Sequence, residues 1–305
     1  MSSTADKRMV KRADVEFDGV GGIKLRGWLY SPAGNGPYPA ITMAHGFAGT
    51  REHRLDAYAQ EFASSGFVVL LHDHRNFGAS DGNPRNDIDP WQQLADWRRA
   101  ISFLERQTLV NPLKIGLWGS SYAGGHALFL GATDRRLCCV VAQVPTISGF
   151  EQSLRRVSPD KVGALEESFA EDERAQFSGE PPRVQQVVSL DPNVAAAYRT
   201  QDAHDFYFLP AAKGSWENSV TLRSSRAARM YEPGIWAPRV SPTPLLMVIA
   251  KHDTITLTDT ALGAYEKALH PKRLAMIEGG HFDAYISQFK QSSSAALEWF
   301  REHLS

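Results

Sequence analysis

The sequence predicts an α/β fold in which a mostly parallel central sheet is flanked by helices. Short apolar runs typical of buried strands alternate with helix-like segments along most of the chain. A tight turn rich in small residues, within 117–125, joins one of these strands directly to a helix. The chain has 305 residues, 43% of them hydrophobic and 22% charged, which is enough apolar material for one large core. These features favour one α/β domain with an insertion over two equal domains.

The N-terminal half predicts most of the sheet. Residues 15–17 and 23–30 are expected to form an opening hairpin, with the glycine-rich stretch 19–22 as its turn. Helices are expected over residues 55–64, 90–105 and 122–131. Between them, buried strands are expected over residues 40–43, 68–71, 115–118 and 138–142.

The helix over residues 90–105 has a complete start signal. Asp89 is the expected N-cap, Pro90 occupies the first helical position and Gln92 the third. Apolar residues then recur at helical spacing, and we expect them to face the sheet: Trp91, Leu94, Trp97, Ile101 and Leu104.

The last third of the chain returns to the same alternation. Strands are expected over residues 244–250 and 272–277, and helices over residues 261–269 and 295–303. Residues 145–236 interrupt the pattern with charged helix-like pieces and an aromatic cluster. The sequence therefore divides into a core, residues 1–144 and 237–305, and an inserted segment, residues 145–236.

Ser121 lies at the centre of the tight turn and is the best candidate nucleophile. A nucleophile elbow bends so sharply that the positions two before and two after the serine must be small, and Gly119 and Ala123 meet that requirement. Ser120 fits less well, because Trp118 would then stand two residues before it. Taken alone, the pentapeptide is also compatible with a Gly/Ser loop that has no chemistry.

The order of residues downstream strengthens the catalytic interpretation. A nucleophilic serine needs a base, usually histidine, which a carboxylate orients. Asp253 follows the strand over 244–250, and His281 follows the strand over 272–277. Asp259 and Asp283 are the competing acids, but Asp259 is typical of a helix start and Asp283 follows the base too closely to support it from behind.

Several motifs carry a resemblance to a known superfamily: Ala44-His45-Gly46-Phe47, the stretch 73–82, the turn at Ser121, Asp253 and Gly280-His281. Over nearly its whole length the chain resembles the α/β-hydrolase superfamily, in which the order Ser, Asp, His is the usual one. Within it, stretches 73–91 and 214–244 are similar to dienelactone-hydrolase-like esterases and to hydrolases and acyltransferases associated with polyketide pathways. The chain departs from the pattern at Ala123, where glycine is usual, and at Lys251-His252, where a small residue is common.

The resemblance implies that residues 145–236 form a mainly helical lid over the active site. Phe206 and Trp216 are the candidate substrate-binding residues, because large aromatic side chains in a lid can line an apolar acyl pocket. The alternative is that these aromatics anchor the lid to the core.

The oxyanion hole is expected to use two backbone N–H groups. One belongs to Tyr122, directly after the nucleophile, and the other to the loop that contains Phe47. His45, in the same loop, is expected to have a structural role.

The expected function is that of a serine hydrolase that cleaves a carboxylic ester, lactone or thioester of a mainly apolar acyl group. Ser121 would attack the carbonyl, His281 would transfer the proton and Asp253 would orient His281. An acyltransferase that uses the same triad is the first alternative, and a peptidase or a non-catalytic binding protein are weaker ones. No cofactor is expected for this chemistry.

Other ligand classes have little support in the sequence. His72 and His74 have the spacing of two ligands on one strand face, but no third ligand cluster accompanies them, so no metal is expected. His126 is expected to pack against the sheet. The formal net charge of −1 gives no reason to expect a nucleic acid or an anionic membrane as partner. The expected partner is the small-molecule ester, lactone or thioester substrate.

The sequence favours a cytoplasmic protein. Residues 1–12 are basic without an apolar signal core, and no apolar run approaches the roughly 18 residues of a membrane span. Cys138 and Cys139 are adjacent in a strand, so they should point to opposite faces and pack as free thiols. The oligomeric state stays open between a monomer and a homodimer.

Overall fold

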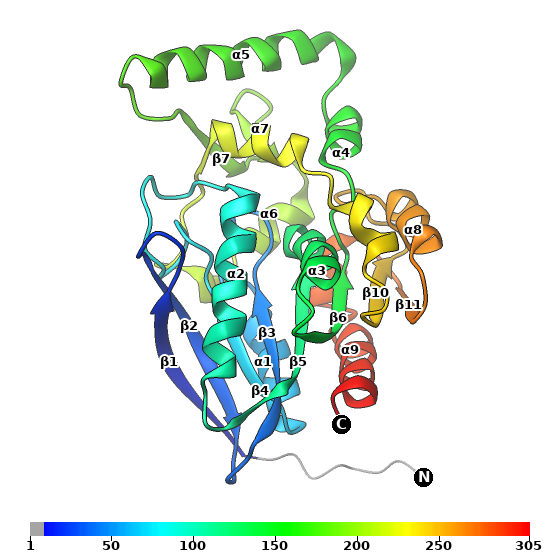
Figure 1. Ribbon diagram of the computed structural model, residues 1–305. Coiled ribbons are helices and arrows are strands. Elements are labelled where there is room, and N and C mark those ends of the chain that lie inside the picture. The colour runs from blue at the N-terminus through cyan, green and yellow to red at the C-terminus, as the bar shows by residue number, and fades with distance from the viewer. Residues whose placement is uncertain (1–8) are drawn as a thin grey trace.

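An eight-stranded sheet forms the centre of the computed structural model, which describes residues 9–305 (Figure 1). Its order is β1-β2-β4-β3-β5-β6-β10-β11, and only the pairs β1·β2 and β2·β4 are antiparallel. The prediction of a mostly parallel sheet is therefore confirmed. Its strands are β1 (Val10–Asp18), β2 (Lys24–Pro32), β3 (Tyr38–Ala44), β4 (Val68–His72), β5 (Val110–Ser120), β6 (Leu137–Gln143), β10 (Leu245–Ala250) and β11 (Lys272–Ile277).

Helices cover both faces of this sheet, which is why its central strands are continuous apolar runs. One face carries α2 (Pro90–Glu105) and α3 (Tyr122–Thr133), and the other carries α1 (Leu55–Ser64) and α9 (Phe289–Leu304) (Figure 1). Another helix, α8 (Thr258–Lys267), packs beside β10. Large side chains such as Trp97, Trp118 and Phe300 are fully buried between the layers.

The predicted helix bounds 55–64 and 90–105 are those of α1 and α2. The Asp89 carboxylate accepts hydrogen bonds from the N–H groups of Trp91 and Gln92, as expected of an N-cap. The prediction that Trp91 faces the sheet is wrong, because its side chain is 59% exposed. In the first turn of α2 it packs edge-on against Phe129 and Tyr231 instead of against the strands.

The segment 145–236 contains four α-helices and a small second sheet. The helices are α4 (Gly149–Arg156), α5 (Pro159–Phe177), α6 (Gln201–Tyr207) and α7 (Leu222–Met230). The second sheet, in the order β8-β7-β9, consists of β7 (Val184–Val188), β8 (Ala196–Tyr198) and β9 (Val220–Thr221). Its strands have two to five residues, too few for a clear alternation, which explains why they were not predicted.

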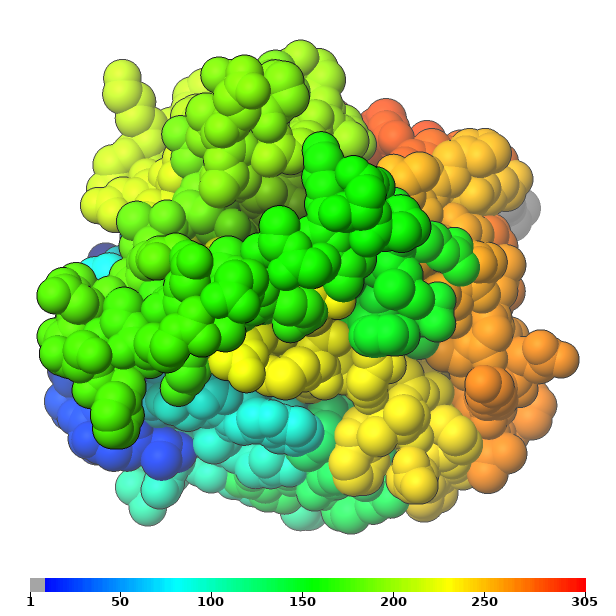
Figure 2. Space-filling view, turned by 90° about the horizontal axis from the view of Figure 1, so that it is seen from above, coloured from blue at the N-terminus to red at the C-terminus, as the bar shows by residue number. Residues whose placement is uncertain are grey.

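Several of these elements lie at one end of the central sheet. In Figure 1, α5 and α7 lie above the sheet, and Figure 2 shows α5 crossing this end of the molecule. Two short 3-10 helices, η1 (Pro210–Ala212) and η2 (Pro233–Arg239), complete the segment and its return to the core. The third, η3 (His281–Tyr285), follows β11.

Candidate active site

Ser121 occupies the turn between β5 and α3 in a backbone conformation that few side-chain residues adopt, with φ 60° and ψ −121°. Hydrogen bonds to neighbouring strands and loops hold this conformation. The Ser121 N–H donates to the Gln143 carbonyl at 2.9 Å, and its carbonyl accepts from the Gly124 and Thr146 N–H groups, each at 2.9 Å.

Two glycines make room for this turn. A Cβ atom on Gly119 would lie 2.0 Å from the carbonyl oxygen of Ala123, so no side chain fits there. A Cβ atom on Gly46 would lie 3.0 Å from the Cβ atom of Ser121, which places the loop after β3 directly against the serine. The predicted need for a small residue before Ser121 thus has a direct steric cause.

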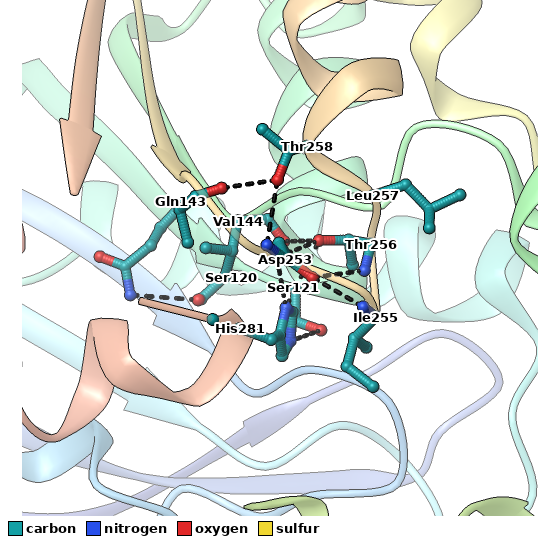
Figure 3. Close-up of polar contacts among 12 residues, drawn as sticks. Ser120, Ser121, Gln143, Val144, Asp253, Ile255, Thr256, Leu257, Thr258 and His281 are labelled. Carbon is teal, nitrogen blue, oxygen red and sulfur yellow. Dashed lines mark hydrogen bonds and ion pairs between the residues drawn. The ribbon is translucent and has the colours of Figure 1, made fainter. Parts of the chain in front are cut away.

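A continuous chain of hydrogen bonds joins Ser121, His281 and Asp253 (Figure 3). His281 Nδ1 lies 2.8 Å from Asp253 Oδ2, and His281 Nε2 lies 3.0 Å from Ser121 Oγ. Because an ionised carboxylate only accepts, Nδ1 carries the proton in this arrangement and Nε2 is free to accept the serine hydroxyl proton. The side chains of His281 and Asp253 are each only 2% exposed, so bulk water does not compete for these bonds.

The Asp253 carboxylate is held on both oxygens. Oδ1 accepts from the N–H groups of Ile255 and Thr256, each at 2.8 Å, and Oδ2 also accepts from the Thr256 hydroxyl at 2.7 Å. Burial acts to raise the pKa of Asp253, but the charge and hydrogen bond of His281 and the bonds from Thr256 outweigh it and hold the pKa below its usual value. The sequence did not identify Thr256 as a support for the carboxylate. The available signal was a hydroxyl residue three positions after Asp253.

The competing residues lie in other contacts. Asp259 pairs with Arg155 at the surface, and the Asp283 carboxylate accepts from the Gly280 N–H and the Ser287 hydroxyl. Ser120 Oγ lies 2.5 Å from the Tyr285 hydroxyl and not beside His281. Of the candidates considered, the structure therefore brings together only Ser121, Asp253 and His281.

Two backbone donors stand free beside Ser121. The N–H groups of Phe47 and Tyr122 have no acceptor among the described residues, and both residues line a cavity that contains Ser121. His45 Nδ1–H donates to the Gly46 carbonyl at 2.9 Å, and its Nε2 accepts from the His74 N–H at 3.0 Å. Burial lowers the pKa of His45 to about 4, so its ring is neutral and holds this loop in place.

The amino-acid sequence matches a known protein family. The model described as X-Pro dipeptidyl-peptidase (S15 family) matches residues 18–283. The chain belongs to this family. The quorum-quenching protein AidA of Acinetobacter baumannii is 31% identical, with 90% of this chain and 89% of that protein covered. A thiohydrolase of Aspergillus aculeatus is 32% identical, with 90% and 87% covered.

Solved structures show the α/β-hydrolase fold. The α/β hydrolase GrgF from Penicillium sp., also described as a polyketide transferase, superimposes with a TM-score of 0.83 at 29% identity over 96% of this chain and 99% of that chain. An esterase of Pyrococcus furiosus, 17% identical with a TM-score of 0.65, shares the fold, and covers 97% of this chain and 92% of that chain. The predicted resemblance to α/β hydrolases and to polyketide-associated enzymes is confirmed.

In this S15-family chain, Ser121 opens into a cavity of about 150 Å³ beneath the 145–236 segment. Its walls come from α4, α5, α7, β7 and β8 as well as from the core. Phe169 and Arg229 line both this cavity and a larger groove of about 970 Å³. The inserted segment therefore shapes the space that an acyl group bound to Ser121 would enter.

The two predicted pocket aromatics lie in different places. Phe206, with Ser121 and His281, borders a smaller cavity of about 20 Å³, and its ring centroid is 4.7 Å from that of Phe282. Trp216 is not among the residues that line the cavities at Ser121. Its indole N–H donates to the Ala48 carbonyl at 2.8 Å, in the loop that also contains Phe47. This contact favours the alternative that Trp216 anchors the inserted segment to the core.

Four histidines form a buried cluster: His45, His72, His74 and His126. The ring centroid of His74 is 4.7 Å from that of His45, 5.4 Å from that of His72 and 5.7 Å from that of His126. Within residues 9–305, no group of three or more His, Cys, Asp or Glu side chains is arranged to hold a metal ion. His126 is buried, as expected, and its ring nitrogens contact the Tyr231 hydroxyl and the Gln93 side chain.

Proposed function

We propose that the chain is a serine hydrolase that cleaves an ester, lactone or thioester through an acyl-enzyme on Ser121. The hydrogen-bonded chain from Ser121 through His281 to Asp253, beside two free backbone N–H groups, is the observation that carries this proposal. Relatives named thiohydrolase support it.

In the proposed reaction, Ser121 Oγ attacks the substrate carbonyl carbon while His281 Nε2 takes the hydroxyl proton. The amides of Phe47 and Tyr122 stabilise the oxyanion. The C–O or C–S bond then breaks as His281 returns the proton to the leaving group. Water attacks the acyl-enzyme, His281 accepts its proton, and the carboxylic acid leaves as Ser121 regains its hydrogen.

Acyl transfer is the second candidate, because relatives are also named polyketide transferase. The steps are the same except that an alcohol or amine replaces water. Product analysis with an added alcohol acceptor would separate the two, since a transferase converts the acyl-enzyme mainly to the new ester while a hydrolase releases mainly the acid.

Ser121→Ala tests the proposal directly. We expect it to lower kcat for p-nitrophenyl butyrate by at least about 10³-fold and to abolish labelling by a fluorophosphonate, with the melting temperature nearly unchanged. Ser120→Ala is the matched control and should be far milder. Equal losses in the two variants would contradict the assignment of Ser121.

We also propose that the substrate is a small molecule and that the protein is cytoplasmic. Phe206 is a candidate wall for a small-molecule acyl group, because it borders the same space as Ser121 and His281.

Both cysteines, Cys138 and Cys139, are free thiols, which suits the reducing cytoplasm. Among the described residues no helix is long and apolar enough to cross a membrane.

A further inference from the structure

Helix α4 turns a polar face toward the cavity at Ser121. Gly149, Gln152, Ser153 and Arg156 line that cavity, at the spacing of one helical face. The apolar side chains of the same helix face outward: Phe150 is 52% exposed and Leu154 48%. A surface helix ordinarily buries its apolar side, so the reversed polarity of α4 indicates that polar groups are needed at the cavity.

Gln152 is the most informative residue of this face. It is only 7% exposed, and its Nε2 has no hydrogen-bond partner among the described residues. Buried polar groups in native proteins are nearly always paired, so an unpaired amide in a ligand-sized cavity points to a group that the substrate supplies. Gln185 lines the same cavity but is already satisfied, because its Nε2 donates to the Ser225 hydroxyl at 2.5 Å.

The rest of the cavity is largely apolar. Phe47, Tyr198 and Ile255 contribute walls near Ser121, and Leu165 and Phe169 contribute walls from α5. A cavity of about 150 Å³ holds a group of about the size of benzene, so the acyl chain that fits is short. Such a chain would lie between apolar walls and two unpaired side-chain donors, the Gln152 amide on α4 and the Tyr122 hydroxyl next to the nucleophile.

We propose that Gln152 determines specificity by donating its side-chain N–H to an oxygen atom on the acyl chain. The preferred substrates would then be short oxoacyl esters or thioesters, in which a second carbonyl lies beyond the scissile one. A ketone oxygen only accepts hydrogen bonds and therefore matches the free donor. The inference rests on the proposed function and adds to it the chemical class of the acyl group.

The experiment compares N-acetylcysteamine thioesters of hexanoic, 3-oxohexanoic and 5-oxohexanoic acid. We expect the wild type to favour at least one oxoacyl thioester over hexanoyl by about tenfold or more in kcat/KM. Gln152→Met should lower this ratio to near one and change hexanoyl turnover by less than about threefold. The matched control, Gln185→Met, should keep the wild-type ratio.

A second readout separates recognition from a structural role. Because Gln152 has no protein partner to lose, Gln152→Met should not lower the melting temperature. A wild type without oxoacyl preference, or a variant that loses activity equally on all three thioesters, would overturn the proposal. Fluorophosphonate labelling of Ser121 and hexanoyl turnover test the proposed function separately, so the two failures are distinguishable.

Discussion

At the scale of single residues, the proposed mechanism requires Asp253 to hold His281 in the form that can act as a base. Its carboxylate accepts four hydrogen bonds, one of them from His281 Nδ1, and this fixes the ring tautomer that leaves Nε2 facing Ser121. Asp253→Asn removes the charge and permits the opposite tautomer. We expect kcat for p-nitrophenyl butyrate to fall by about 10⁴-fold with little change in KM.

Asp283→Asn is the control for this prediction, since the Asp283 carboxylate binds the Gly280 N–H and the Ser287 hydroxyl rather than the base. Its effect on kcat should be much smaller. A severe loss in Asp283→Asn together with a nearly silent Asp253→Asn would reassign the acid.

At the scale of elements, the inserted segment holds the loop that contains Phe47, the proposed oxyanion donor, and also shapes the cavity. The Tyr207 hydroxyl donates to the Phe47 carbonyl at 2.7 Å, and the Trp216 indole N–H donates to the Ala48 carbonyl at 2.8 Å. Trp216→Phe keeps most of the ring packing but removes this donor. We expect kcat to fall by about tenfold to a similar degree for acetyl, butyryl and octanoyl esters, because one loop-positioning hydrogen bond is lost.

The exposed Trp91 provides a matched control, and Trp91→Phe should leave kcat unchanged. Measuring all three esters distinguishes positioning from pocket lining. If Trp216→Phe changes the ratio of octanoyl to acetyl kcat/KM by more than about tenfold, Trp216 contacts the acyl chain after all.

At the scale of the whole molecule, buried histidines make the fold sensitive to acid. Burial lowers the pKa of His45 to about 4 and the pKa values of His72 and His126 to about 3. The unfolded chain takes up these protons near pH 6.5, whereas the folded chain does not. The free energy of unfolding is therefore not reduced by these histidines above about pH 6.5, and it decreases as the pH falls toward 4. The decrease is up to about 1.4 kcal/mol per pH unit for each histidine.

His72→Phe tests this dependence by removing one titrating group from the core. Urea unfolding measured between pH 6.5 and 4.5 should show a slope of unfolding free energy against pH that is smaller by about one proton, or about 1.4 kcal/mol per pH unit. A wild-type slope in His72→Phe would show that His72 does not carry this dependence.

Features that depend on neighbours in the chain were determined by the sequence itself. The start of α2 follows from Asp89 and Pro90. Asp89 accepts hydrogen bonds from N–H groups of the first turn, and Pro90 has no N–H that needs an acceptor. The elbow follows from Gly119, because the clash that excludes a side chain there is with Ala123, four residues away. The positions of Asp253 and His281 after apolar strands likewise predicted their arrival at one edge of the sheet.

The tertiary structure decided what depends on partners far away in the chain. Asp259 and Asp253 are both acidic residues near the end of β10, and only folding shows that one pairs with Arg155 and the other with His281. Trp216 is an apolar aromatic in sequence, but its role follows from a carbonyl 168 positions earlier. Gln152 is an ordinary polar helix residue until the packing of α4 buries it beside Ser121 without a partner. Local sterics and capping act within a few residues and can be inferred from sequence, whereas burial and hydrogen-bond partnership arise only when distant segments pack together.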